Sequence, residues 1–362
     1  MAKKVSAKAI HPAVYFLALS LFAMGSAEFL MGGILPMIAE DLQITLPGAG
    51  TLISAFAVGA LIGGPPFAIL ALRWPGRSIL FFSQMAFIVA TASSLLAQGY
   101  WPILVARFTM GLAYACFWAV AAATAVQLSH HDRRAKALSI VVSGLTAAMV
   151  IGGPAGTLVS EFAGWRGGFW AVAAVTALSA VCGLLALPEK TFGTAAVTNL
   201  QTELQAMRRP ILWLAYATTM LTTAAYMCTF GYLGAMLVTV SGVSAERLPV
   251  VLILFGIGAF VGLTMGGRTA DRHTFSTLVT GIIGLIIASA AIALFAAYWQ
   301  AAVTLVFVLG LAGFLLNPAV WGARLCRRTG CTDARGSDQL ISLPSRFDAC
   351  SATWRHPDRS WL

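Results

Sequence analysis

Long apolar segments alternate with short polar gaps along the chain as far as about residue 322. A bilayer core of roughly 30 Å needs about 20 apolar residues in a helix to cross it. Ten segments meet that length: 13–37, 48–72, 79–98, 102–128, 138–160, 169–187, 210–240, 248–267, 276–296 and 301–322. Lipid offers no hydrogen-bond partners to an open sheet edge, so each segment is expected to be helical. The pattern predicts an all-α, polytopic membrane protein.

Composition agrees with a membrane setting. Hydrophobic residues make up 59% of the chain and charged residues only 10%, whereas soluble domains carry about 25% charged residues. No polar stretch is long enough to form a sizeable soluble domain beside the apolar segments. The expected location is therefore the cell membrane, with the lipid bilayer as the main surroundings of the chain.

The net charge is +10, and the placement of the basic residues along the chain indicates the membrane topology. Basic residues gather at the N-terminus and in the gaps after the second, fourth, sixth and eighth segments: Lys3, Lys4, Lys8, Arg73, Arg77, Arg133, Arg134, Lys136, Lys190, Arg208, Arg209, Arg268 and Arg272. The opposite gaps hold only Arg166 and Arg247. Because cytoplasmic loops of membrane proteins are enriched in Lys and Arg, the N-terminus is predicted to be cytoplasmic. A nucleic-acid partner is not expected.

Cysteine and histidine positions argue against an enzyme or a metal site. The five histidines, His11, His130, His131, His273 and His356, all fall in predicted gaps or tails. Cys326, Cys331 and Cys350 lie near the C-terminus, but their spacing fits no compact ligand pattern. The nucleophile and zinc-hydrolase motifs GxSxG and HExxH are absent. We therefore expect no catalytic residues, no metal and no cofactor.

An internal repeat divides the chain. "GALIG" at 59–63 returns as "GAFVG" at 258–262, an offset of 199, and an arginine follows ten residues later in both places, Arg73 and Arg272. Transporters built from two parallel six-helix halves show such repeats. We predict an N-terminal six-helix bundle over 1–187, a cytoplasmic central linker over 188–209 and a C-terminal bundle of helices 7–10 over 210–322.

The polar tail at 323–362 departs from the repeat. The fifth segment should recur near 337–359, but that stretch contains three Asp and three Arg and cannot span a bilayer. Two interpretations are open. The tail is a natural cytoplasmic extension, or the chain leaves its native reading frame near Gly322, so that the last two of twelve helices are missing and six plus four remain.

Two charged residues lie inside apolar segments of the first half. Glu28 is eight residues before Pro36, roughly 12 Å from the outer end of its helix, and Arg107 is five residues after Pro102, roughly 8 Å from the same face. Intramembrane charges are costly and are usually paired or face a water-filled cavity. Glu28 is therefore expected either to be a protonation site read by Arg107 and substrate, or to form a permanent structural ion pair with it.

Aromatic and methionine side chains are candidates for the wall of a substrate cavity. Met31 lies one turn from Glu28, Tyr114 and Trp118 share one helical face, and so do Tyr226 and Phe230. Apolar walls with few polar groups suit a drug-sized, largely neutral ligand. Packing in the core or against lipid is the alternative for each of the five.

Several motifs carry a family resemblance. The fifth segment is rich in helix-breaking and close-packing residues, namely Gly144, Gly152, Gly153, Pro154 and Gly156, and is followed by Gly164, Trp165, Arg166 and Phe169. "RFTMG" begins at Arg107, and "GRTADR" supplies Gly267, Asp271 and Arg272. The chain resembles the drug/proton antiporter branch of the major facilitator superfamily, and within it actinobacterial chloramphenicol-resistance exporters.

The resemblance implies a fold, a function and some residue roles. It implies the major facilitator fold and proton-coupled efflux of chloramphenicol by a monomer through alternating access, driven by the proton gradient. Export of sugars or other metabolites, or an inactive truncated exporter, are the alternatives. Gating at the cytoplasmic loops is assigned to Arg73, Arg77, Gly267, Asp271 and Arg272. The first-half motif is degraded, because Leu72 stands where the family usually has an acid.

Overall fold

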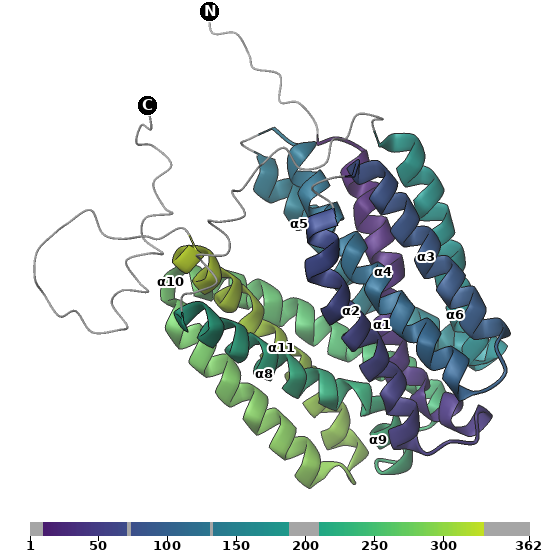
Figure 1. Ribbon diagram of the computed structural model, residues 1–362. Helices are drawn as coiled ribbons and strands as arrows, with labels where there is room; N and C mark the ends of the chain where they lie inside the picture. Colours follow the sequence, from purple (N-terminus) through teal and green to yellow (C-terminus); the bar gives the residue numbers. More distant parts are fainter. Residues whose placement is uncertain (1–9, 71–73, 131–132, 188–209, 329–362) are drawn as a thin grey trace, which may run out of the picture. The chain divides into compact units, whose positions relative to one another are not determined.

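The computed structural model describes residues 10–70, 74–130, 133–187 and 210–328, and all regular structure in these ranges is helical (Figure 1). The elements are α1 (Ala13–Asp41), α2 (Leu46–Leu70), α3 (Gly76–Leu96), α4 (Tyr100–Gln127), α5 (Arg134–Ala147), η2 (Ala148–Gly152), α6 (Gly153–Ala186), α8 (Pro210–Gly231), α9 (Leu233–Thr239), η3 (Ala245–Arg247), α10 (Leu248–Phe295) and α11 (Trp299–Arg328). The prediction of an all-α membrane protein is confirmed.

The helices match the apolar segments closely. Nine spans among the described residues are long and apolar enough to cross a membrane. One of them, Lys136–Ala186, is 51 residues long, about 76 Å at 1.5 Å per residue and far more than one crossing needs. It is interrupted at Gly164, where φ is 71° and ψ is 167°. That break lies between the predicted segments 138–160 and 169–187, whereas the division into six plus four helices stays a prediction.

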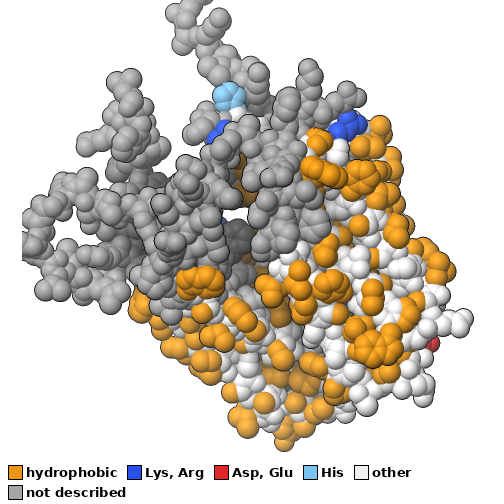
Figure 2. Space-filling view, viewed as in Figure 1, with side chains coloured by type: hydrophobic (Ala, Val, Ile, Leu, Met, Phe, Trp, Pro, Cys, Tyr) orange, Lys and Arg blue, Asp and Glu red, His pale blue; other side chains and the backbone are white. Residues whose placement is uncertain are grey.

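The outer surface suits a lipid environment. On the face shown in Figure 2, hydrophobic side chains cover much of the described surface and charged ones are sparse. Large apolar side chains are strongly exposed, among them Phe162, Leu185 and Trp101. Exposed apolar surface on this scale would favour aggregation in water, but in a bilayer it contacts the acyl chains.

The chain forms two compact units: Met1–Ala196 with Ser244–Pro249, and Val197–Val243 with Val250–Leu362. The predicted linker 188–209 and most of the polar tail lie outside the described residues. In the first unit, α1 is the central helix and is buried along most of its length, packed by α6, α5, η2, α2 and α4. Helix α3 packs on α4 and α6, and α2 packs on α4.

Glycines allow α2 and α4 to pack with their backbones close together. A Cβ on Gly59 of α2 would overlap the Phe108 carbonyl of α4, and a Cβ on Gly111 of α4 would overlap the Phe56 carbonyl of α2. Small residues that permit such approach are characteristic of helix pairs in membranes.

The second unit repeats this contact at the predicted offset of 199 residues. A Cβ on Gly258 of α10 would overlap the Phe307 carbonyl of α11, and a Cβ on Gly310 of α11 would overlap the Phe255 carbonyl. Each of these four residues is its first-unit counterpart plus 199, with the residue type unchanged. The internal repeat is therefore confirmed as a repeat in space as well as in sequence.

The repeat also shows where the described parts of the two units differ. In the first unit α6 packs on α3, and Gln84 and Phe87 of α3 are 4% and 0% exposed. Their counterparts on α10, Ile283 and Ile286, are 51% and 63% exposed. A groove of about 500 Å³ lies between α8 and this part of α10. The described part of the second unit contains no counterpart of α5, η2 and α6.

Candidate functional site

Arg107 is held at a junction of four helices in the first unit. It lies on α4 and only 3% of it is exposed. Its Nε donates to the Leu52 carbonyl of α2 and its Nη1 to the Ala27 carbonyl of α1, both at 3.5 Å. The guanidinium carbon lies 5.2 Å from the centre of the Phe56 ring and 5.5 Å from that of Phe169 on α6. Carbonyl oxygens and ring faces both stabilise a desolvated cation.

Glu28 lies beside this junction. It directly follows Ala27 on α1, and its side chain is partly buried. No direct ion pair joins Glu28 to Arg107 among the described side chains, although the Arg107 guanidinium donates to the carbonyl of Ala27, the residue before Glu28. The structure thus places the two residues at the same level of the bundle without locking them together, and the roles predicted for them stay predictions.

The helix-five motif packs on α1 on both sides of Glu28. Its glycines lie where a side chain would collide with α1: Gly144 against the Ala18 carbonyl, Gly152 against the Ser26 hydroxyl, Gly153 against Phe29 and Gly156 against Leu30. The π-helical turn η2 ends directly before Gly153 and Pro154. Proline has no N–H to donate, so a locally widened helix at this point is expected. The motif therefore brings its helix into close contact with α1 at residues before and after Glu28.

The predicted loop-gating residues are only partly within the described structure. Arg73 lies in 71–73, and the side chains of Asp271 and Arg272 fall in 270–274, both outside the description, although the backbone of α10 is helical across the second stretch. Arg77 of α3 donates from Nη2 to the Leu184 carbonyl of α6 at 2.9 Å. Gly267 has open space around its α-carbon.

The predicted cavity residues divide into two groups. Met31, Tyr226 and Phe230 are buried, and the last two stack within the second unit, Tyr226 on Phe314 and Phe230 on Phe255. Their part in the wall of a substrate cavity stays a prediction, with core packing as the alternative. Tyr114 and Trp118 on α4 are partly buried, with the Tyr114 ring 5.6 Å from that of Phe56.

The arrangement and motifs have a counterpart in a known family. The family model described as Major Facilitator Superfamily matches residues 17–324. The chain belongs to the major facilitator superfamily. It is 39% identical over 334 residues, covering 91% of this chain and 85% of the relative, to the "Chloramphenicol resistance protein" of Streptomyces lividans. It is 30% identical over 302 residues, 83% of this chain and 77% of the relative, to the inner membrane transport protein YdhP of Escherichia coli K12.

Solved structures of the superfamily share the fold. A bacterial homologue of the human lysosomal transporter Spinster, inward-facing and unoccupied, matches with a TM-score of 0.70 at 18% identity, over 90% of this chain and 79% of that one. A D-xylose–proton symporter matches with a TM-score of 0.64 at 14% identity, over 89% and 90% of the two chains. At these identities the likeness establishes the fold alone. Family and relatives together identify a multi-pass membrane transporter rather than an enzyme.

The sequence draws attention to Glu28 and Arg107, but it does not indicate the residues that contact the arginine. Leu52 contributes only a carbonyl, which leaves no trace in the side-chain pattern. Phe169 appeared as part of a family signature, and Phe56 is one of the chain's 21 phenylalanines. A charge inside an apolar helix was the signal for Arg107, and neutral aromatic partners carry no equivalent signal.

Proposed function

We propose that this chain exports chloramphenicol, a small and largely neutral antibiotic, in exchange for protons. The observation that carries the proposal is the position of Glu28, a titratable residue that directly follows Ala27, whose carbonyl accepts a hydrogen bond from the buried Arg107. The 39% identity to a protein named for chloramphenicol resistance supports the choice of substrate. Proton-gradient drive accounts for energy coupling without a cofactor.

The site has two electrostatic states. An ionised Glu28 is attracted to Arg107 across a region of low dielectric, and protonation of Glu28 removes that attraction. Arg107 itself contacts two backbone carbonyls and two rings, so the Glu28 side chain is the part that responds to the change. Protonation from outside and deprotonation to the cytoplasm, alternating with drug binding, would couple proton entry to drug exit.

The helix-five motif gives this switch a rigid support. Because Gly144, Gly152 and Gly156 already bring their helices into close contact with α1, the helix carrying Glu28 has little room to move toward α5 and α6. When solvent access changes, a carboxylate held in this way changes its protonation state and keeps the same neighbours. We infer that a single monomer is sufficient for this exchange.

The test is a resistance and accumulation assay in a chloramphenicol-sensitive bacterial host. Cells making the wild-type chain should accumulate less drug, and accumulation should rise when a protonophore collapses the gradient. Glu28→Gln should abolish this difference at normal membrane abundance, whereas Glu40→Gln, an exposed acid at the outer end of α1, should leave it intact. Export by Glu28→Gln at the wild-type level, or chemically modified drug in the medium, would contradict the proposal.

A further inference from the structure

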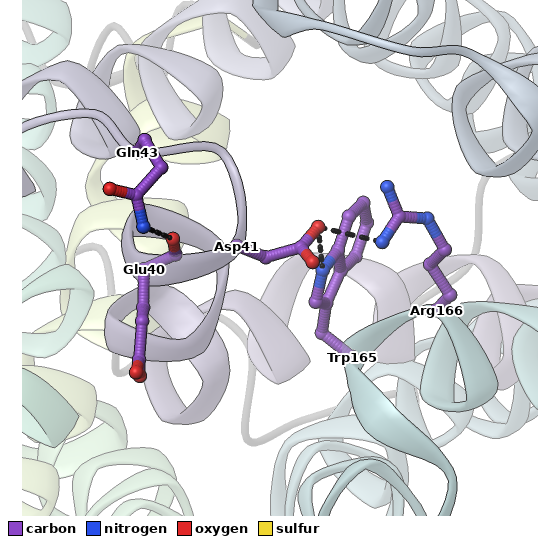
Figure 3. Close-up of polar contacts among 5 residues, drawn as sticks. All are labelled: Glu40, Asp41, Gln43, Trp165 and Arg166. Carbon is purple, nitrogen blue, oxygen red and sulfur yellow. Dashed lines mark hydrogen bonds and ion pairs between the residues drawn. The ribbon is translucent and has the colours of Figure 1, made fainter.

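A polar clamp joins the outer end of α1 to α6. Asp41, the last residue of α1, accepts a hydrogen bond on Oδ2 from the Trp165 indole Nε1 at 3.1 Å and an ion pair from Arg166 Nη1 at 2.7 Å (Figure 3). The Arg166 guanidinium lies 4.3 Å from the centre of the Trp165 ring. One carboxylate therefore orients both side chains.

The backbone turn before these residues depends on glycine. Gly164 has φ 71° and ψ 167°, in a region that residues with a Cβ avoid. The helical stretch is broken there, and Trp165 and Arg166 follow immediately, facing the end of α1. Each residue of the Gly-Trp-Arg sequence thus has a physical role. Gly164 forms the turn, Trp165 donates a hydrogen bond to Asp41, and Arg166 forms an ion pair with it.

The clamp continues inward to the charged site. Trp165 is 5% exposed, and its ring meets that of Phe169 edge-on with centroids 6.2 Å apart. Phe169 is 3% exposed, and its ring lies 5.5 Å from the Arg107 guanidinium carbon. Arg107 in turn donates to the carbonyl of Ala27. A continuous chain of contacts therefore runs from the end of α1 through α6 and α4 to the residue beside Glu28.

The aromatic residues in this series of contacts contribute much to holding Arg107 in place. Both hydrogen bonds of its guanidinium to carbonyls are 3.5 Å long, the outer limit for such a bond. Long bonds restrain direction weakly, so the contacts with the Phe56 and Phe169 rings contribute much to where the cation lies. A change that lets Phe169 rotate would shift Arg107 relative to Glu28.

We propose that Asp41 and Trp165 are positioning residues for proton coupling, acting through Phe169 on Arg107. This rests on the proposed function, because it assigns the clamp a task in the same exchange. Asp41 fixes the indole by its N–H, the indole fixes the Phe169 ring, and that ring sets the distance between Arg107 and Glu28. The outer clamp thereby controls how tightly proton movement follows drug movement.

The test measures protons moved per chloramphenicol exported, using purified protein in proteoliposomes with an imposed pH gradient. Asp41→Ala should lower this ratio by about half, because a small misplacement at a reacting site has a large effect. Phe169→Leu should lower it to the same degree, and the double variant should be no worse than either single one. Asp41→Glu should restore the ratio, and Glu40→Ala should match the wild type.

A merely structural clamp would give a different result. Loss of folded protein lowers the amount of drug exported but leaves the ratio of protons to drug unchanged. An unchanged ratio in Asp41→Ala, or additive losses in the double variant, would overturn the inference. Trp165→Phe, which keeps a ring against Phe169 but removes the indole N–H, should fall between wild type and Asp41→Ala.

The outcome is separable from that of the proposed function. If wild-type protein moves no chloramphenicol, the proposed function fails, and thermal unfolding of the same variants tests the contact chain by itself. Destabilisation by Asp41→Ala and by Phe169→Leu should then be non-additive, since both break one chain of contacts. Additive shifts in unfolding temperature would overturn the positioning role in that case too.

Discussion

Replacing Gly144 by alanine should loosen the helix that carries Glu28. A Cβ at this position would overlap the Ala18 carbonyl oxygen of α1 and lie 2.8 Å from its carbonyl carbon and 3.0 Å from its Cα. These are backbone atoms of a helix packed on several sides, so a side-chain rotation cannot relieve the overlap. Helix α1 must move away from α5, and its contacts with η2 and α6 are disturbed with it.

The magnitude follows from overpacking and helix propensity. Inserting a methyl group into a well-packed site costs about 1–3 kcal/mol, and rigid backbone neighbours place this site near the upper end. Alanine recovers about 1 kcal/mol relative to glycine inside a helix. The net loss is therefore about 2 kcal/mol. Gly183→Ala in α6 is the matched control, because no atom lies within 4 Å of its added Cβ, and it should gain up to about 1 kcal/mol.

The assay compares thermal unfolding of the two variants in the same detergent. A difference of about 3 kcal/mol corresponds to roughly 6–12 °C for a unit of this size. Gly144→Ala should unfold earlier than wild type and Gly183→Ala at or above it. If the two variants unfold within about 1 °C of each other, the close approach of α5 to α1 is not a feature of the folded protein.

The remaining predictions concern the repeat, a helix contact and the exposed face of the second unit. Gly111→Ala and Gly310→Ala should both lower the unfolding temperature, since each added Cβ meets a backbone carbonyl; tolerance of both would argue against the repeated contact. Arg77→Ala should cost about 1.5–3 kcal/mol by removing its hydrogen bond to α6, and unchanged unfolding would refute that contact. In an otherwise cysteine-free chain, Ile286→Cys should react with a lipid-soluble maleimide far faster than Phe87→Cys, because only Ile286 is exposed; equal rates would contradict the difference between the units.

Segment length, the repeat offset and the level of the charges could be predicted from the sequence. Helix length is set by bilayer thickness, and apolar runs report it directly. The offset of 199 required only two short matching motifs, and the structure extends it to the backbone contacts of Gly111 and Gly310. That Arg107 on α4 lies at the level of Glu28 on α1 follows from counting residues from the ends of the two helices, because the rise per residue is constant.

Rotation about the helix axes could not be predicted in the same way. Counting residues gives depth but leaves open which neighbour a side chain faces, such as Phe314 for Tyr226 and Phe255 for Phe230. The two backbone carbonyls that accept from Arg107 lie 55 and 80 residues away in sequence. Such contacts depend on how four helices pack together, which no local pattern specifies.

The clamp formed by Asp41, Trp165 and Arg166 could not be predicted from the sequence for a related reason. Asp41 and Arg166 lie in gaps between apolar segments, and their side chains are 44% and 37% exposed. Their pairing depends on the break in α6 at Gly164, directly before Trp165 and Arg166. An ion pair formed across 125 residues is visible only once the helices are placed.

The most direct test of the account is drug-driven proton movement in proteoliposomes containing only this protein. Adding chloramphenicol on one side should cause protons to move in the opposite direction in wild type. Glu28→Gln should abolish that proton movement, and Glu40→Gln should preserve it. Chloramphenicol transport without any proton movement in wild type, or full coupling in Glu28→Gln, would contradict the role given to the carboxyl beside Arg107.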